Sequence, residues 1–290
     1  MDLAAIAQTV AVVAALAGMT PQEKAAAVVV SGLPAPPGVG GVIIMGDDLG
    51  LEWPDGPIVF TDQEGEGVKR FAGLPPFHPA SWYRKTADAF LAGRATGRAL
   101  RRVGVDVDLA PVLDSADGPL GSRHFRRPAL GLAFARGLAA GGAGACAKHF
   151  PGLGSAAIST DDRPHVDATV REDEVAAFRA AIDAGVPCVM TSNAFYDGRR
   201  FRASVEPSAY RLLRSLGFEG VAITDSLSVV RRAPVERWAP QAIRAGADLV
   251  LFTSPEHARR AIRALVPLAK TGALDPHVAR VLRFRRALAR

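Results

Sequence analysis

The sequence has 290 residues, of which 49% are hydrophobic and 22% are charged, and its formal net charge is +6. This is enough chain for a large core, and one α/β barrel of about 250 residues fits it. Much of the positive charge lies in arginine runs within 199–202, 231–237 and 280–290. Such runs are typical of solvated helix faces, and they lack a series of interleaved aromatic residues for stacking bases. We therefore expect no nucleic-acid partner, and we leave a polyanionic or phosphorylated partner as an open alternative.

Cysteine use and the N-terminal stretch indicate the expected compartment. Cys146 and Cys188 lie in apolar strand-like runs, and we expect two buried free thiols and no disulfide. Residues 3–18 are rich in Ala and Val, but no Lys or Arg precedes them, and the run is too short to span a bilayer. We expect residues 1–18 to form a helix that packs on the barrel, in a cytoplasmic protein with no membrane partner. The sequence predicts no oligomeric state.

Apolar runs and helical patterns alternate along the chain. Thr20 followed by Pro21 predicts a helix start, because Thr caps a helix and Pro fits its first position. Predicted strands lie at 26–31, 41–45, 57–61, 105–112, 145–149, 187–191, 220–224 and 248–252. Predicted helices separate most of them, at 84–102, 129–141, 171–184, 207–215, 236–245 and 255–270. Eight strands alternating with helices predict an α/β fold, a (β/α)8 TIM-type barrel that forms a single domain over residues 1–290.

The seventh predicted strand ends at an acidic residue. Residues 221–223 form a short apolar run, and Asp225 follows where the strand would reach the surface. Active sites of parallel α/β barrels are built at this end of the strands, which favours Asp225 as a catalytic nucleophile. The alternative is that Asp225 caps the following helix.

Other predicted strands also end in polar residues. The candidates are Asp62 after the third strand, Asp106, Asp108 and Asp114 around the fourth, Lys148 and His149 on the fifth, and Asn193 after the sixth. Carboxylates accept hydrogen bonds from sugar hydroxyls, and Lys and His donate to them. If these ends meet at one barrel mouth, they predict a site for a polyhydroxylated ligand. No cofactor and no metal site are expected, because the histidines outside these motifs have no partners at metal-binding spacing.

Nine short motifs occur in the order of one enzyme family. They lie at 19–24, 40–44, 62–65, 108–114, 123–125, 148–152, 189–191, 217–225 and 245–249. The most specific are Lys-His-Phe-Pro-Gly at 148–152 and the segment that ends at Asp225. On these motifs the chain resembles the catalytic barrel of glycoside hydrolase family 3. Within that family it is most similar to the single-domain bacterial β-N-acetylhexosaminidases.

The resemblance implies roles for individual residues. Asp225 matches the family's nucleophile, which forms a covalent glycosyl-enzyme intermediate in a retaining mechanism. The residues implied in substrate binding are Asp62, Arg70, Arg123, Lys148 and His149, together with Asn193, which stands where the family usually has a histidine. The implied substrate is a β-linked amino sugar, such as N-acetylglucosamine released from cell-wall fragments, which places the protein in carbohydrate metabolism.

The loop after residue 152 departs from the family pattern. The family supplies an Asp-x-His dyad here, whose histidine is the acid/base. Counting forward from Lys148, that histidine falls on Asp161 and its partner on Ser159; counting backward from Pro164, it falls on Thr160. Ser226 also replaces the usual second acid after the nucleophile, and Glu66 replaces a glycine.

Three hypotheses follow from this loop. In the first, Asp161, Asp162 or His165 is a substitute acid, and we take Asp161 as the candidate catalytic residue. In the second, the acid/base is lost, so that the protein uses good leaving groups or transfers the glycosyl group to an acceptor other than water. In the third, the barrel binds a sugar without turning it over.

Overall fold

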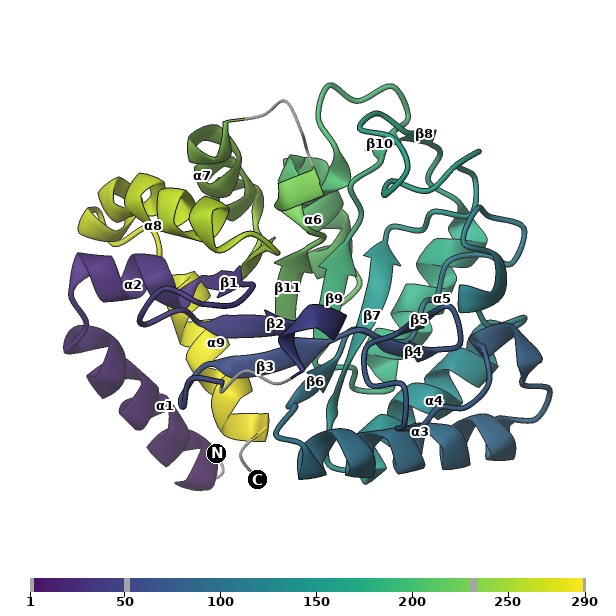
Figure 1. Ribbon diagram of the computed structural model, residues 1–290. Coiled ribbons are helices and arrows are strands. Elements are labelled where there is room, and N and C mark those ends of the chain that lie inside the picture. The colour runs from purple at the N-terminus through teal and green to yellow at the C-terminus, as the bar shows by residue number, and fades with distance from the viewer. Residues whose placement is uncertain (1–2, 50–52, 230–233, 289–290) are drawn as a thin grey trace.

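The computed structural model describes residues 3–49, 53–229 and 234–288 (Figure 1). Eight parallel strands lie side by side in the order β11-β9-β7-β6-β3-β2-β1-β12. They are β1 Val29–Ser31, β2 Gly41–Ile44, β3 Ile58–Thr61, β6 Val107–Asp108, β7 Gly144–Phe150, β9 Cys188–Thr191, β11 Val221–Thr224 and β12 Val250–Phe252. A parallel bridge between Ile223 and Leu249 brings the two ends of the sheet together. The predicted (β/α)8 barrel is therefore confirmed.

Helices surround the strands (Figure 1). They are α1 Leu3–Ala17, α2 Pro21–Ala27, α3 Thr86–Arg102, α4 Pro128–Ala140, α5 Glu172–Asp183, α6 Pro207–Ser215, α7 Val235–Ala245, α8 Pro255–Lys270 and α9 Asp275–Leu288. Helix α2 begins as predicted, because the Thr20 side chain accepts from the Glu23 backbone N–H and the Glu23 carboxylate accepts from the Thr20 N–H. Such a reciprocal cap satisfies two backbone donors that the helix leaves unpaired.

Two pairs of short strands lie outside the barrel sheet. Antiparallel β4 Gln63–Gly65 and β5 Val68–Lys69 form a hairpin after β3, and parallel β8 Asp167–Ala168 and β10 Phe195–Tyr196 pair after β7 and β9. Single turns of 3-10 helix occur as η1 Gly46–Asp48, η2 Ala80–Trp82, η3 Gly121–Arg123, η4 Ala203–Val205 and η5 Leu227–Val229. Most of these elements follow barrel strands, so they build the mouth at the carboxyl end of the barrel, where sites form in this fold.

The barrel interior has its own apolar core. It contains Val30, Ile43, Phe60, Leu109, Met190, Ile223 and Leu251 from the strands, and it continues into Val281 and Phe284 of α9. Helix α9 therefore covers one end of the barrel interior. The arginine run at 280–290 was expected to be a solvated helix face, but one side of this helix is buried. A larger cluster fills the layer between the strands and the outer helices.

The expectation of two free thiols is wrong, because a disulfide bond joins Cys146 and Cys188. The two residues are register partners on neighbouring strands β7 and β9, with Cα atoms 4.4 Å apart, and neither side chain is exposed. Their side chains point into the same interior cluster. Strand register is set by tertiary pairing, which the apolar runs alone do not reveal.

The N-terminal stretch forms α1, which packs against α9. Val12 is buried in the core, and the Arg286 guanidinium donates to the Ala11 carbonyl over 3.1 Å. Among the described residues, no helix combines the length and the apolarity that crossing a bilayer requires. Residues 231–233 and 289–290, which belong to the arginine runs of the sequence, lie outside the described residues.

Candidate active site

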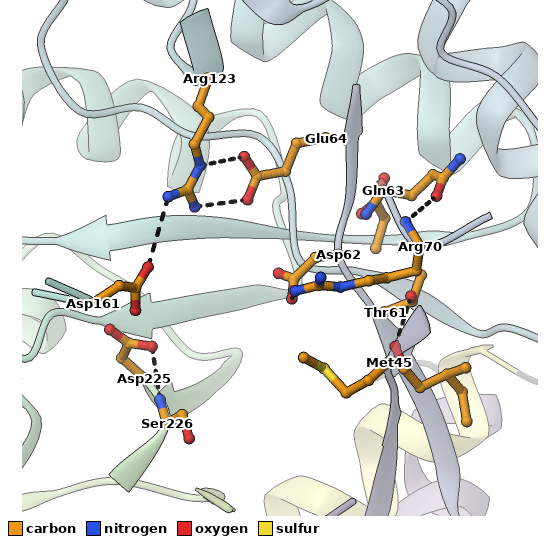
Figure 2. Close-up of polar contacts among 12 residues, drawn as sticks. Met45, Thr61, Asp62, Gln63, Glu64, Arg70, Arg123, Asp161, Asp225 and Ser226 are labelled. Carbon is orange, nitrogen blue, oxygen red and sulfur yellow. Dashed lines mark hydrogen bonds and ion pairs between the residues drawn. The ribbon is translucent and has the colours of Figure 1, made fainter. Parts of the chain in front are cut away.

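A pocket of about 270 Å³ opens at the carboxyl ends of the barrel strands. Its charged and ionisable lining consists of Asp62, Arg70, Arg123, Lys148, His149, Asp161 and Asp225. Lys148 and His149 lie on β7, and the others come from the connections after β3, β6, β7 and β11. Figure 2 shows Asp62, Arg70, Arg123, Asp161 and Asp225 around one space. The residues to which the resemblance gives a role therefore line one pocket, with the exception of Asn193; Asp106, Asp108 and Asp114, the other acids expected at the strand ends, do not line it.

Asp62 lies directly after β3 and is the acceptor for two cations. The Lys148 Nζ atom is 2.6 Å from Asp62 Oδ1, and an Arg70 Nη2 atom is 3.3 Å from Asp62 Oδ2. Burial raises the pKa of Asp62, but Lys148, Arg70 and Arg123 outweigh it and lower the pKa to about 2. Asp62 is therefore an ionised acceptor for ligand hydroxyls at neutral pH.

Glu64 is a site residue that the sequence reasoning did not assign. It is 4% exposed, with its Oε1 atom 2.6 Å from Lys148 Nζ. Arg123 donates to it through a two-pronged contact, Nε to Oε2 at 2.8 Å and Nη2 to Oε1 at 2.9 Å (Figure 2). Alternation on strand β4 places Glu64 on the same side of the backbone as Asp62, which was the available signal. Glu64 therefore fixes the positions of Lys148 and Arg123.

The Glu64 contacts predict a specific defect for Glu64→Gln. The change removes the carboxylate that two buried cations share, and breaking such a pair costs about 3–5 kcal/mol in free energy of unfolding. We expect the Kd for a sugar ligand to rise at least about tenfold, because Lys148 and Arg123 lose their fixed positions. Chemical denaturation and calorimetric titration measure the two effects. Glu66→Gln, at an exposed position of the same hairpin, is the matched control; equal effects in both variants would contradict this role.

His149 is held in one orientation by Asp114. Its Nδ1 atom lies 2.6 Å from Asp114 Oδ2, and the other oxygen of Asp114 accepts from the Leu153 N–H over 2.8 Å. Because Nδ1 is engaged, Nε2 is the ring nitrogen left for a ligand. The His149 backbone has a φ of 133°, a conformation that costs about 1–3 kcal/mol outside glycine and is characteristic of functional sites.

Asp225 follows β11 and faces the pocket. Its backbone N–H donates to the Thr191 carbonyl over 2.9 Å, which ties it to the end of β9, and its Oδ1 accepts from the Ser226 N–H over 2.7 Å. Among the described residues, the Asp225 carboxylate accepts from no N–H group of η5, and Ser226 Oγ accepts from the Ser228 N–H instead. Burial is the main cause that raises the pKa of Asp225; Asp161 adds to it, and His149 and Lys148 oppose it.

Among the three candidate acids of the divergent loop, Asp161 is the one that lines the pocket. It lies beside Asp225 (Figure 2), and its Oδ2 atom is 3.9 Å from an Arg123 Nη1 atom. Asp162 is exposed. His165 points elsewhere, because its ring stacks on Phe195 and its Nε2 is 3.2 Å from Asp167 Oδ1.

The loop that carries Asp161 is anchored by hydrogen bonds near both ends. Near its start, Tyr196 donates to the Gly152 carbonyl over 2.7 Å, and the Gly154 N–H donates to Glu174 over 2.8 Å. Near its end, Arg202 donates to the Pro164 carbonyl over 3.0 Å. A Cβ atom on Gly152 would meet the Glu174 side chain at 2.5 Å, so this close approach requires glycine.

Asn193 lies beside the pocket lining and not within it. Its Nδ2 donates to the Ser226 carbonyl over 2.9 Å, and its Oδ1 accepts from the Ser204 hydroxyl over 2.7 Å. The side chain is 1% exposed, and both of its polar ends have protein partners. The geometry therefore gives Asn193 the role of holding the segment after Asp225, and its predicted contact with substrate has no support from these positions.

Asp108 is a buried acid next to the charged network. It is not exposed, its Oδ1 accepts from the Gln63 N–H over 2.9 Å, and its Oδ2 has no hydrogen-bond partner among the described residues. Burial raises its pKa to about 8. At neutral pH the folded protein therefore holds a proton on Asp108 that the unfolded chain releases.

This proton predicts a pH dependence of stability. Because the folded pKa of Asp108 is raised from 3.8 to about 8, folding takes up a proton between these values, and stability falls as pH rises through that window. The slope reaches at most about 1.4 kcal/mol per pH unit. Asp108→Asn keeps an acceptor for the Gln63 N–H but cannot ionise. The free energy of unfolding of the variant, relative to that of wild type, should therefore increase from about pH 5 to about pH 7.5. Denaturant titrations in which this difference between variant and wild type stays constant over the range would contradict the prediction.

Comparison with known proteins finds a family profile and named relatives that agree with each other. A profile described as the glycosyl hydrolase family 3 N-terminal domain matches residues 54–284. A protein of Bordetella pertussis named beta-hexosaminidase is 30% identical over 232 residues, which cover 69% of this chain and 65% of that protein. This chain therefore matches just under two thirds of that relative's length.

Solved structures with the same fold include two hexosaminidases. The β-N-acetylhexosaminidase from Beutenbergia cavernae is 26% identical with a TM-score of 0.82, and the match covers 94% of this chain and 100% of that chain. The family 3 β-N-acetylglucosaminidase from Paenibacillus sp. is also 26% identical with a TM-score of 0.82, over 94% of this chain and 64% of that chain.

Proposed function

Since the chain belongs to glycosyl hydrolase family 3, whose N-terminal domain it matches, we propose that it hydrolyses β-linked N-acetylhexosaminides by a retaining mechanism. The observation that carries the proposal is the position of Asp225 in a pocket whose other charged groups match sugar hydroxyls. The names of the related proteins support an N-acetylated amino sugar as the substrate class, and cell-wall fragments are a natural source of it.

The ring of the sugar would be held by the charged network. Asp62 is kept ionised by Lys148 and accepts hydrogen bonds, and Lys148 and Arg123 donate with positions fixed by Glu64. His149 offers Nε2 because Asp114 engages Nδ1. Groups preset in this way lose little freedom when a ligand binds, which favours one orientation of the anomeric carbon toward Asp225.

Two chemical steps follow. In the first, the Asp225 carboxylate attacks the anomeric carbon, the bond to the leaving oxygen breaks, and an acid gives that oxygen a proton. In the second, water attacks the glycosyl-enzyme, gives its proton to the same residue, and Asp225 leaves. We assign the acid/base role to Asp161, because it lies beside Asp225 on the pocket wall.

The exposure of the Asp161 side chain favours a second candidate function. Its side chain is 62% exposed, and its nearest ion-pair contact, Arg123, is 3.9 Å away. A general acid is most effective when burial holds its proton near neutral pH, and a bound sugar would have to provide that burial. If it does not, the protein is an acid-deficient enzyme that uses activated leaving groups or transfers the glycosyl group to another acceptor.

The stereochemistry of the product tests the proposal. Hydrolysis of an aryl N-acetyl-β-D-glucosaminide followed by proton NMR should show the β-anomer of N-acetylglucosamine first, because two displacements restore the configuration. First formation of the α-anomer would contradict a glycosyl-enzyme on Asp225. Absence of product, together with binding of N-acetylglucosamine by titration, would favour the sugar-binding alternative.

The cellular location is a separate proposal. The sequence predicts a cytoplasmic protein, and the Cys146–Cys188 disulfide is instead typical of proteins from oxidising compartments. Fractionation of the producing cells, with the free and bonded thiols of the protein counted, decides between the two.

A further inference from the structure

A second cavity, of about 850 Å³, lies away from the active-site pocket. We call it the arginine groove; it runs between residues 199–201 and helices α7 and α8. Four arginines line it: Arg199, Arg200, Arg237 and Arg244. All four are exposed. The lining also contains the carboxylates of Glu206 and Glu236.

The four arginines of the groove form no ion pair in the described part of the chain, whereas Glu236 is already paired with Arg260 at 2.6 Å. Arg200 lies over the Phe201 ring at 5.4 Å, and Arg237 lies over the Trp238 ring at 5.5 Å. Guanidinium groups are weakly hydrated and bind carboxylates through two parallel hydrogen bonds, so unpaired ones in a groove form a site for anions.

The charges are too widely spread for one small anion. Arg237 and Arg244 are seven residues apart on α7, which at 1.5 Å per residue separates their Cα atoms by about 10 Å along the helix. Arg199 and Arg200 come from a different segment, between β10 and η4. A ligand that contacts both walls must therefore carry several negative charges along its length.

We propose that the arginine groove binds an acidic polysaccharide, a chain of sugars that bears carboxylates at intervals. A nucleic acid is a poorer match, because Phe201 is the one aromatic residue in the described lining of the groove, whereas stacking of successive bases needs a series of rings. This binding surface goes beyond the proposed function, since it shares no lining residue with the pocket that contains Asp225. It would hold the protein on an acidic glycan independently of turnover at Asp225.

The test compares two double variants with the same change in charge. Arg237→Glu/Arg244→Glu alters the groove, and Arg136→Glu/Arg179→Glu alters exposed arginines on α4 and α5 that have no ion pair among the described residues. Binding of an oligogalacturonate to each full-length protein is measured by calorimetry at about 0.15 M salt, where long-range attraction is screened. We expect the groove variant to lose at least about tenfold in affinity and the control less than about threefold.

Several outcomes would overturn the proposal. They are no binding of oligogalacturonate by wild type, an equal loss in both double variants, and tighter groove-dependent binding of single-stranded DNA than of the glycan. Arg199→Gln/Arg200→Gln is a second groove variant on a loop, so a folding defect in α7, visible by thermal unfolding, leaves the test intact. Wild-type affinity in a folded Arg199→Gln/Arg200→Gln protein would also overturn it. Hydrolysis of an aryl glycoside is recorded in parallel, so failure of the proposed activity is distinguishable from failure of the groove.

Discussion

Replacing Asp225 by Asn is expected to lower kcat/KM for every glycoside by at least about 10⁴-fold. The amide cannot form the glycosyl-enzyme, and loss of a nucleophile from a site that acts as a unit has effects of this order. The loss should extend to aryl glycosides with excellent leaving groups, because attack on the anomeric carbon is needed whatever leaves. Steady-state assays with a series of aryl N-acetyl-β-D-glucosaminides measure it.

Two features of the site allow Asp225→Asn to remove the nucleophile without changing the surrounding structure. The amide keeps the size of the carboxylate, and its Oδ1 can still accept from the Ser226 N–H, so we expect the segment after β11 to stay in place. Asn193→Ala is the matched comparison, because it removes the group that holds the Ser226 carbonyl and leaves the nucleophile present. Residual activity above about one hundredth in Asp225→Asn would contradict the assigned nucleophile.

Replacing Asp161 by Asn is expected to separate substrates by leaving group. For glycosides that need protonation, kcat/KM should fall by about 10² to 10⁴-fold, which is the usual contribution of a general acid or base. For activated aryl glycosides the first step needs no proton, so the loss should be much smaller and should fall on hydrolysis of the glycosyl-enzyme. Added azide, an anion that attacks without a general base, should then restore turnover and yield the glycosyl azide.

The neighbouring acid provides the control for Asp161. Asp162→Asn changes an exposed carboxylate on the same loop and does not alter the described pocket lining, so it should retain activity within about twofold of wild type. Equal losses in both variants would indicate a change in the loop and not in the acid. Wild-type activity of Asp161→Asn on ordinary glycosides would contradict its role and leave the acid-deficient enzyme as the account of this loop.

The barrel could be predicted because each strand is a short apolar run followed by a polar tip. A parallel barrel brings those tips together at one end, so Asp62, Lys148, His149 and Asp225 could be expected at one mouth, and they line one pocket. The buried side of helix α9 could not be predicted in this way. Its buried side chains, such as Val281 and Phe284, lie among arginines that hide the apolar pattern.

Pairing between distant segments could not be predicted. The register that joins Cys146 to Cys188 depends on how β7 and β9 align, and the burial of Glu64 depends on the approach of Arg123 from a loop about sixty residues away. In the divergent loop, counting along the chain left three candidate residues for the acid/base role. The stacking of His165 on Phe195 removes one of them from the pocket, and that contact has no signature in the sequence.

The most direct test of the account is the mass of the intact protein after incubation with a 5-fluoro N-acetylglucosaminyl fluoride. The activated leaving group removes the need for an acid, and the ring fluorine slows release of the glycosyl-enzyme, so the measurement isolates the nucleophile from the loop. The account predicts a mass increase of one fluorinated sugar in wild type and in Asp161→Asn, and none in Asp225→Asn. An unchanged wild-type mass, with binding of the sugar shown by titration, or an adduct on Asp225→Asn, would contradict it.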